Sequence, residues 1–305
     1  KPEPSPEERW KHMGLFRVAN AIWTTSSLPA EASYGRDLAS YLSGEAFSTE
    51  LNDSTRGLLD EWVARKSSGQ IRSAGVDDIP PATVAIAVSA AMFCSQWADS
   101  GPEPYFPIKA TKDRAFATRS NGSKTCPFMG RADYWSYQYR REFSAILIPY
   151  TLQGTGMVVI LPSKEAGIEG LLQQISKEGI GAILADFASA YGIVRMPKYD
   201  YRCEYERNPF IPDPNGLSLG RLFARVSMRF PLSIAKQVAE ISVNEEGTEA
   251  LAVENAIMIG SSGRKPPPPF ELTFDRPFVF FIMGPDSEVP LFAGIVNDPT
   301  DKGKK

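Results

Sequence analysis

Few residues of this 305-residue chain have the types and spacing that enzyme catalysis requires. Its one histidine, His12, lies in a proline-rich N-terminal segment, where we expect a surface residue. Nucleophilic catalysis and metal sites that depend on histidine are therefore disfavoured. The cysteines Cys94, Cys126 and Cys203 are far apart and form no C-x-x-C pair. This spacing indicates isolated thiols in or near the core, and neither a disulfide framework nor a zinc site.

Two glycine-containing stretches fail as nucleotide-binding motifs. The GTG sequence at residues 154–156 continues to Val159, where a dinucleotide-binding fingerprint has its third glycine. The GSSGRK sequence at residues 260–265 lacks the spacing and the final Lys-Ser/Thr of a phosphate-binding loop. No pair among the 36 acidic residues is marked as catalytic. We therefore predict a protein that is not an enzyme and that uses no metal and no cofactor.

Composition excludes further classes of protein. Hydrophobic residues make up 43% of the chain, which is enough for a large buried core. The net charge of −3 disfavours binding to nucleic acid or to an anionic membrane, and no apolar run has transmembrane length. The N-terminal sequence is typical of an internal segment or of a processed end, and Asn52 and Asn121 begin N-x-S sequons. We expect a secreted glycoprotein, with a cytoplasmic location as the alternative.

Strand patterns are scattered among helical ones. Helices are predicted at residues 37–42, 49–66, 168–178 and 217–223. Strands are predicted within 114–129 and at residues 15–23, 83–93, 143–150, 157–162, 193–199, 238–244, 270–274, 278–283 and 291–296. Without regular βαβ alternation, this order predicts an α+β fold with large mixed or antiparallel sheets. No internal linker divides the chain, so we expect one domain over residues 1–305.

The stretch 241–300 contains a segment that neither a helical nor a strand pattern explains. It begins with small side chains at residues 247–252 and continues to loop chemistry at residues 260–269, including four consecutive prolines. A long structureless segment between strands in a compact domain usually has a function.

Several segments, in order along the chain, resemble the serpin family. NEEGTEA at residues 244–250 resembles the hinge that opens the serpin reactive-centre loop. FDRPFVFFI at 274–282 and PLFAGIVNDP at 290–299 resemble the strands that follow that loop. Earlier matches are VANAIW at 18–23, DEWV at 60–63 with Ser67 and GQI at 69–71, Phe93 with Trp97, and IPY at 148–150 with MVVILP at 157–162.

The resemblance implies a serpin-like α+β fold with large mixed sheets, surrounding helices and an exposed reactive-centre loop at about 247–269. It also implies a monomeric suicide inhibitor of a serine protease. The protease cleaves the loop and forms an acyl-enzyme, and the cleaved loop inserts as a new strand into the main sheet. The alternative is a non-inhibitory serpin that acts as a binding, carrier or chaperone-like protein.

Insertion requires small or β-compatible side chains on the inward face of the loop, because successive side chains alternate faces. In the family register Thr248, Ala250 and Ala252 satisfy this requirement, whereas Glu254 would bury an unpaired carboxylate. Gly247 is expected to supply conformational freedom. The implied hinge comprises Glu246, Gly247, Thr248, Glu249, Ala250, Leu251 and Ala252.

The reactive bond has more than one candidate. Arg264 suits a trypsin-like pocket, which places the bond between Arg264 and Lys265. Counting from the hinge by family habit places it instead near Ser261 and Ser262. The hydrophobic residues 257–259 would suit chymotrypsin-like or elastase-like enzymes.

The chain also departs from the family pattern. No counterpart of the helical section that normally precedes Leu15 is found, so the sequence is either a fragment or a shortened member. Asp60 replaces an asparagine, Ser89 replaces the asparagine of a buried strand, and Gln237 replaces a histidine. We expect these changes to weaken the polar network under the main sheet.

Overall fold

The computed structural model describes residues 15–98, 104–120, 122–207, 234–248, 270–285 and 290–301. The chain divides into two compact units, each assembled from separate segments. The α3 unit contains mainly residues 16–93 and 201–241, and the α4 unit contains mainly residues 94–200 and 242–302. Strands β3, β9 and β10 run from one unit into the other. The single domain expected over residues 1–305 stays a prediction.

The first sheet contains six strands among the described residues, and its order brings distant segments together. Strands β1 and β2 pair in parallel, as do β3 and β10. The short strand β11 is antiparallel to both β3 and β10. Across the sheet the strands are β2 (Glu45–Thr49), β1 (Leu15–Thr25), β3 (Ala85–Gln96), β11 (Gly247–Thr248), β10 (Ile234–Val243) and β9 (Tyr199–Arg207).

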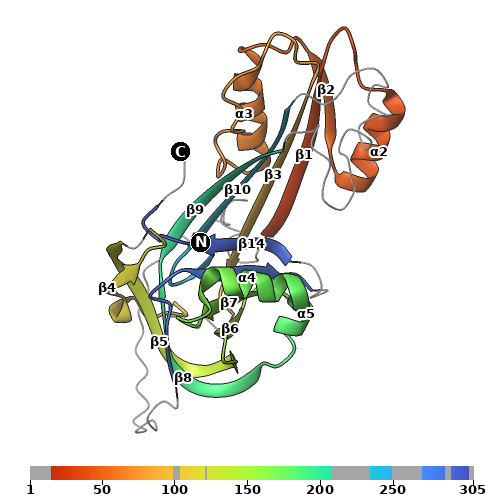
Figure 1. The fold of residues 1–305 in the computed structure, drawn as a ribbon. Helices are drawn as coiled ribbons and strands as arrows, with labels where there is room; N and C mark the ends of the chain where they lie inside the picture. Colours follow the sequence, from red (N-terminus) through yellow and green to blue (C-terminus); the bar gives the residue numbers. More distant parts are fainter. Residues whose placement is uncertain are drawn as a thin grey trace, which may run out of the picture. The chain divides into compact units, whose positions relative to one another are not determined.

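Two helices of the α3 unit lie on either side of its sheet strands (Figure 1). They pack on neighbouring residues of β1. Helix α3 (Thr55–Lys66) buries Leu59 and Trp62 in a cluster that includes Trp23. Helix α2 (Ala32–Leu42) buries Leu38 against Ile22, the neighbouring residue of β1. Because successive strand residues point to opposite faces, the two helices cover opposite faces of the sheet.

The helix predicted at residues 49–66 is wrong in its first part. Residue 49 ends β2, and α3 begins only at Thr55. The intervening turn is held by side chains: the Asn52 Oδ1 accepts the Ser54 N–H at 2.9 Å, and the Thr55 hydroxyl donates to the Glu50 carbonyl at 2.6 Å. Such short polar side chains satisfy the backbone outside a helix and so delay its start.

The second sheet belongs to the α4 unit and is antiparallel except for the pair β12–β8. Helix α4 (Gly167–Glu178) lies next to β7 (Figure 1). Its Ile168 and Leu171 belong to one apolar cluster with Val158 of β7 and Phe281 of β13. Strand β4 (Lys112–Ala117) pairs with β5 outside the main path. Along that path the strands are β12 (Phe270–Thr273), β8 (Ala188–Pro197), β5 (Ser123–Tyr139), β6 (Phe143–Pro149), β7 (Gly156–Pro162), β13 (Phe278–Met283) and β14 (Pro290–Val296).

Most predicted elements within the described residues are confirmed, including the buried strand β3 and the β6–β7 hairpin. The strand at 193–199, predicted to be broken at its proline, is divided there into β8 and β9, which are separated after Pro197. The short helix α5 (Ile180–Ile183) was not predicted, and the helix predicted at 217–223 lies outside the described residues. Cys94 and Cys126 are buried as expected, but the expectation is wrong for Cys203, which is exposed. No described helix is both long and apolar enough to cross a membrane.

Candidate functional site

The two residues of β11, Gly247 and Thr248, lie between two long strands. Gly247 pairs with Gln96 of β3, and Thr248 pairs with Ser95 of β3 and Val243 of β10. Earlier along β3, residues 86–92 pair directly with residues 234–240 of β10. The start of the predicted hinge is therefore a strand that separates β3 from β10 at one end of their ladder.

The close approach of β11 to β3 requires a glycine at position 247. A Cβ atom there would lie 2.3 Å from the Ser95 carbonyl oxygen and 2.7 Å from the Gln96 Cα. Gly247 is not among the described glycines with positive φ, so a left-handed conformation is not its reason. The expectation of conformational freedom is therefore replaced by a steric requirement: a side chain would collide with the backbone of β3.

A tight turn at residues 244–246 reverses the chain from β10 into β11. The Asn244 N–H donates to the Gly247 carbonyl at 2.9 Å. The Asn244 side-chain oxygen accepts the Glu246 N–H, also at 2.9 Å. Asparagine often stabilises turns by bonding to the backbone two residues later. The NEEG sequence thus encodes both the reversal and the strand that follows it.

Glu245 is 7% exposed and anchors this turn to two other elements. Its carboxylate accepts the Thr111 hydroxyl at 2.8 Å and pairs with Lys198 Nζ at 2.8 Å, while its carbonyl accepts the Phe106 N–H. Burial alone would raise the pKa of Glu245, but the bonds from Lys198 and Thr111 outweigh it and hold the pKa below its ordinary value. Glu245 is therefore ionised at neutral pH.

Trp97 binds the same turn from the end of β3. Its indole N–H donates to the Asn244 carbonyl at 3.0 Å, and its backbone N–H donates to the Glu246 carbonyl at 2.9 Å. The Trp97 ring stacks on Tyr150 with centroids 4.7 Å apart, and Phe106 meets it edge-on at 6.3 Å. This aromatic cluster fixes where the chain leaves β10.

Thr248 is fully buried, and its hydroxyl lies 2.5 Å from the Tyr150 hydroxyl. Burial raises the pKa of Tyr150 far above its ordinary value, so the phenol stays neutral and can donate a hydrogen bond. The threonine side chain fills this buried position, and its hydroxyl is paired with the Tyr150 hydroxyl. The inward-facing position assigned to Thr248 is thus consistent with its burial.

Only part of the predicted site lies within the described residues. Glu246, Gly247 and Thr248 are described, and Glu246 is partly buried. The rest lies outside the described residues: Glu249, Ala250, Leu251, Ala252, Glu254, Ser261, Ser262, Arg264 and Lys265, together with Asn121.

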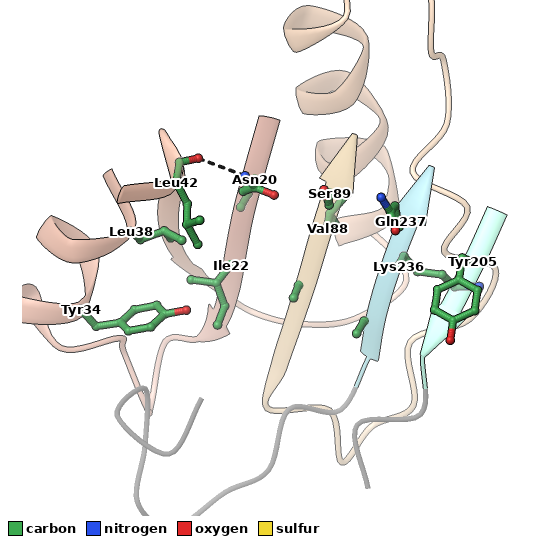
Figure 2. Close-up of a pocket in the computed structure, with 13 residues that line it drawn as sticks. Asn20, Ile22, Tyr34, Leu38, Leu42, Val88, Ser89, Tyr205, Lys236 and Gln237 are labelled. Atoms are coloured by element: carbon green, nitrogen blue, oxygen red, sulfur yellow. Dashed lines mark hydrogen bonds between the residues drawn. The ribbon is translucent and has the colours of Figure 1, made fainter. Parts of the chain in front are cut away.

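The three departures from the family pattern lie in the α3 unit. The Asp60 Oδ1 accepts the Ala74 N–H at 2.7 Å, so the acid still supplies the oxygen that an asparagine would. Ser89 and Gln237 are direct partners in the β3–β10 ladder. Both line a pocket of about 300 Å³. Leu38 of α2 lies at one side of this pocket (Figure 2). The weakening of a polar network here stays a prediction.

Sequence reasoning missed the roles of Glu245, Thr111, Lys198 and the Tyr150 hydroxyl. Glu245 sits within the quoted hinge motif, yet nothing in its neighbours along the chain indicates burial, since its partners are remote. Within the described residues, no group of three or more histidine, cysteine, aspartate or glutamate side chains could hold a metal ion. What the structure places around β11 is backbone pairing with β3 and β10.

A family model described as "Serpin (serine protease inhibitor)" matches residues 10–299. The chain belongs to the serpin family. An uncharacterized serpin-like protein of Thermococcus kodakarensis is 25% identical over 94% of this chain and 67% of its own length. Alpha-1-antiproteinase 2 of Equus caballus is 24% identical over 93% of this chain and 67% of its own length.

A solved structure of thyroxine-binding globulin in complex with thyroxine has a TM-score of 0.76. It is 18% identical in sequence and covers 95% of this chain and 77% of its own. This likeness shows the fold, and the serpin-like α+β architecture expected from the sequence is confirmed. That globulin is described in complex with thyroxine, which is not a protease, so the likeness in fold assigns no target to this chain.

Proposed function

We propose that this serpin is a monomeric inhibitor of a trypsin-like serine protease and is not itself an enzyme. The observation that carries the proposal is the pairing of Gly247 and Thr248 with β3 and of Thr248 with β10. A loop that begins as a strand at this place can extend by adding further residues between the same two strands. Each added residue exchanges solvent contacts for ladder hydrogen bonds and buried side-chain area.

In the proposed reaction the protease serine hydroxyl attacks the carbonyl carbon of Arg264. The Arg264–Lys265 peptide bond breaks, the amine of Lys265 leaves with a proton, and Arg264 remains joined to the protease as an ester. Strand insertion then moves the ester away before water hydrolyses it. Arg264 is preferred because its guanidinium suits a carboxylate-lined pocket. The bond near Ser261 and Ser262 is the alternative.

A second candidate is a non-inhibitory serpin that binds or carries another molecule. Glu254 favours it, because full insertion would bury an unpaired carboxylate. The structural likeness to thyroxine-binding globulin also favours it, since that serpin is described in complex with a small ligand. Secretion, and glycosylation at Asn52 and Asn121, accompany either candidate as predictions.

The two candidates differ in what happens after the loop is cleaved. We expect an inhibitor to form a covalent complex with a trypsin-like protease that survives SDS, and to unfold at a much higher temperature after cleavage within residues 260–265. Gel electrophoresis and calorimetry measure these two effects. Cleavage by a panel of serine proteases with no complex, no inhibition and no rise in Tm would refute the inhibitor and leave the binding protein.

A further inference from the structure

The sheet strands of the α3 unit have a packed face and a hollow face. Toward α3, Val88 of β3 and Val238 of β10 are buried in an apolar cluster with that helix. Their neighbours Ser89 and Gln237 point the other way, because successive strand residues alternate between faces. On this second face α2 packs on Ile22 of β1. The pocket of about 300 Å³ lies beside α2, over β3 and β10.

Small side chains on two paired strands make the pocket hollow. Ala87 of β3 is the ladder partner of Ala235 of β10, and two residues further along Ser89 is the partner of Gln237. All four residues line the pocket. Larger side chains in place of the two alanines would fill it. Its volume of about 300 Å³ is at the lower end of the range for small-molecule sites in proteins.

Helix α2 and β1 supply an apolar wall to the pocket. Figure 2 shows Tyr34 and Leu38 of α2 beside Ile22 of β1. Ile22 and Leu38 are both buried. Burial raises the pKa of Tyr34 to about 12, so its phenol is neutral at physiological pH. One aromatic ring and two aliphatic side chains suit the ring system of an aromatic molecule.

Hydrogen-bonding groups gather over β3 and β10. Within the described part of the chain, no hydrogen bond engages the Ser89 hydroxyl or the Gln237 carboxamide, and both residues line the pocket. Each of these groups can donate and accept. The Asn20 side-chain N–H donates to the Leu42 carbonyl at 3.0 Å, which fixes the Asn20 side chain at the edge of the same pocket. The pocket thus offers a polar end opposite its apolar wall.

The charges around the pocket favour a neutral ligand. Among the described residues that line it, Lys236 alone is charged at neutral pH. The Lys236 Nζ pairs with Glu206 at 2.7 Å, and its side chain is 11% exposed. An ionised ligand would lose its water without gaining a free counter-charge. A neutral polar head would instead exchange hydrogen bonds with water for hydrogen bonds with Ser89 and Gln237.

We propose that this pocket binds a neutral aromatic molecule that carries a carboxamide head. The ring lies against Tyr34, Ile22 and Leu38, and the amide bonds to Gln237 and Ser89. An amide suits Gln237 because both groups present an N–H donor and a carbonyl acceptor. The inference does not rest on protease inhibition: it requires neither cleavage nor insertion of the loop, and it applies equally to an inhibitor and to a binding protein.

Three probes of nearly equal shape test the class of ligand on the intact protein: 2-naphthamide, 2-acetylnaphthalene and 2-naphthoate. Ligand-observed NMR titration measures the Kd of each. The ketone lacks the N–H donors of the amide, so it should bind about fivefold more weakly, which corresponds to one lost hydrogen bond. The carboxylate should bind at least about tenfold more weakly than the amide, because its charge gains no free cation in the pocket.

Two kinds of variant locate the binding site. Ala87→Leu and Ala235→Leu fill the hollow from either strand, and each should weaken all three probes at least about tenfold. Gln237→Met keeps the length of an exposed side chain but removes its amide, so the fivefold preference for 2-naphthamide over the ketone should disappear. Gln173→Met, the same change at an exposed position of α4, should leave every Kd unchanged. Thermal unfolding checks that each variant is folded.

Each outcome supports or overturns the pocket. Loss of the amide preference in Gln237→Met, together with weak binding by both leucine variants, would support it. It would be overturned if wild type bound none of the probes, if the leucine variants bound them as tightly as wild type, or if Gln237→Met kept the preference. These failures leave the proposed inhibition intact, because no protease takes part. Absence of an SDS-stable protease complex would equally leave the pocket intact.

Discussion

Strand β3 has two different neighbours along its length, and they differ in how they are held. At residues 95–96 it pairs with β11, which a single glycine allows to approach and which Trp97, Tyr150 and Glu245 surround. At residues 86–92 it pairs directly with β10, and apolar side chains of both strands share one buried cluster with α3. The first region already accommodates an additional strand, whereas the second must break contacts to do so.

The comparison separates two requirements of a sheet that accepts a new strand. The residue pairs at which the new strand begins must already exist in the native sheet, because they set the register of the residues that follow. The rest must resist opening, or the native state would not persist with its loop outside the sheet. Polar contacts suit both tasks, because a hydrogen bond or ion pair is lost once its two atoms move beyond a fixed distance. Apolar side chains, by contrast, can shift past each other and stay in contact.

The largest expected effect comes from Gly247→Val, which should displace β11, the strand from which loop insertion would begin. The new side chain would meet the β3 backbone, so we expect β11 to leave the sheet and the free energy of unfolding to fall by about 3 kcal/mol. Hydrogen exchange over residues 243–248 and urea unfolding measure this. Gly57→Ala is the control: its Cβ meets nothing in α3, and a gain of up to about 1 kcal/mol is expected. Unchanged protection of Thr248 would contradict the steric argument.

Glu245→Gln should cost about 2 kcal/mol at pH 7, because Lys198 and Thr111 lose a charged acceptor. The folded-state pKa of Glu245 lies below its ordinary value of 4.5, so this contribution is fully present above that value. It is lost as the pH falls through the folded pKa. Urea unfolding of both proteins at pH 7 and at pH 3 tests this, since a difference that persists in acid would be inconsistent with ionisation of Glu245.

The smallest of these effects concerns the hydroxyl pair between Thr248 of β11 and Tyr150. Thr248→Val keeps the shape but leaves the buried Tyr150 hydroxyl without this partner, which should cost about 1–2 kcal/mol. Tyr150→Phe alone should cost a similar amount, and the double variant should recover part of the loss. Thermal unfolding of the four proteins measures the coupling, and strictly additive losses would mean that the two hydroxyls do not stabilise each other.

Local patterns in the sequence predicted much of the fold. Strands such as β7 and β13 carry uninterrupted apolar residues, and α4 carries an apolar stripe, so their types follow from neighbours in the chain. The start of α3 was missed because hydrogen bonds from Asn52 and Thr55 satisfy the backbone before the helix begins. Gly247 and Thr248 of the segment that resembles a hinge do form a strand beside β3, and Thr248 also pairs with β10, while the hinge role itself stays a prediction.

The sequence by itself determined the family, the order of the strands along the chain and the small side chains of the hinge segment. These features depend on residue type and on spacing along the chain. Only the tertiary structure decided why position 247 must be glycine, why Glu245 is buried and charged, and which side chains meet in the pocket beside α2. Thr111 and Glu245 are 134 residues apart, and Trp97 and Asn244 are 147 apart. Contacts of that separation leave no periodic pattern in the sequence, because folding alone brings their partners together.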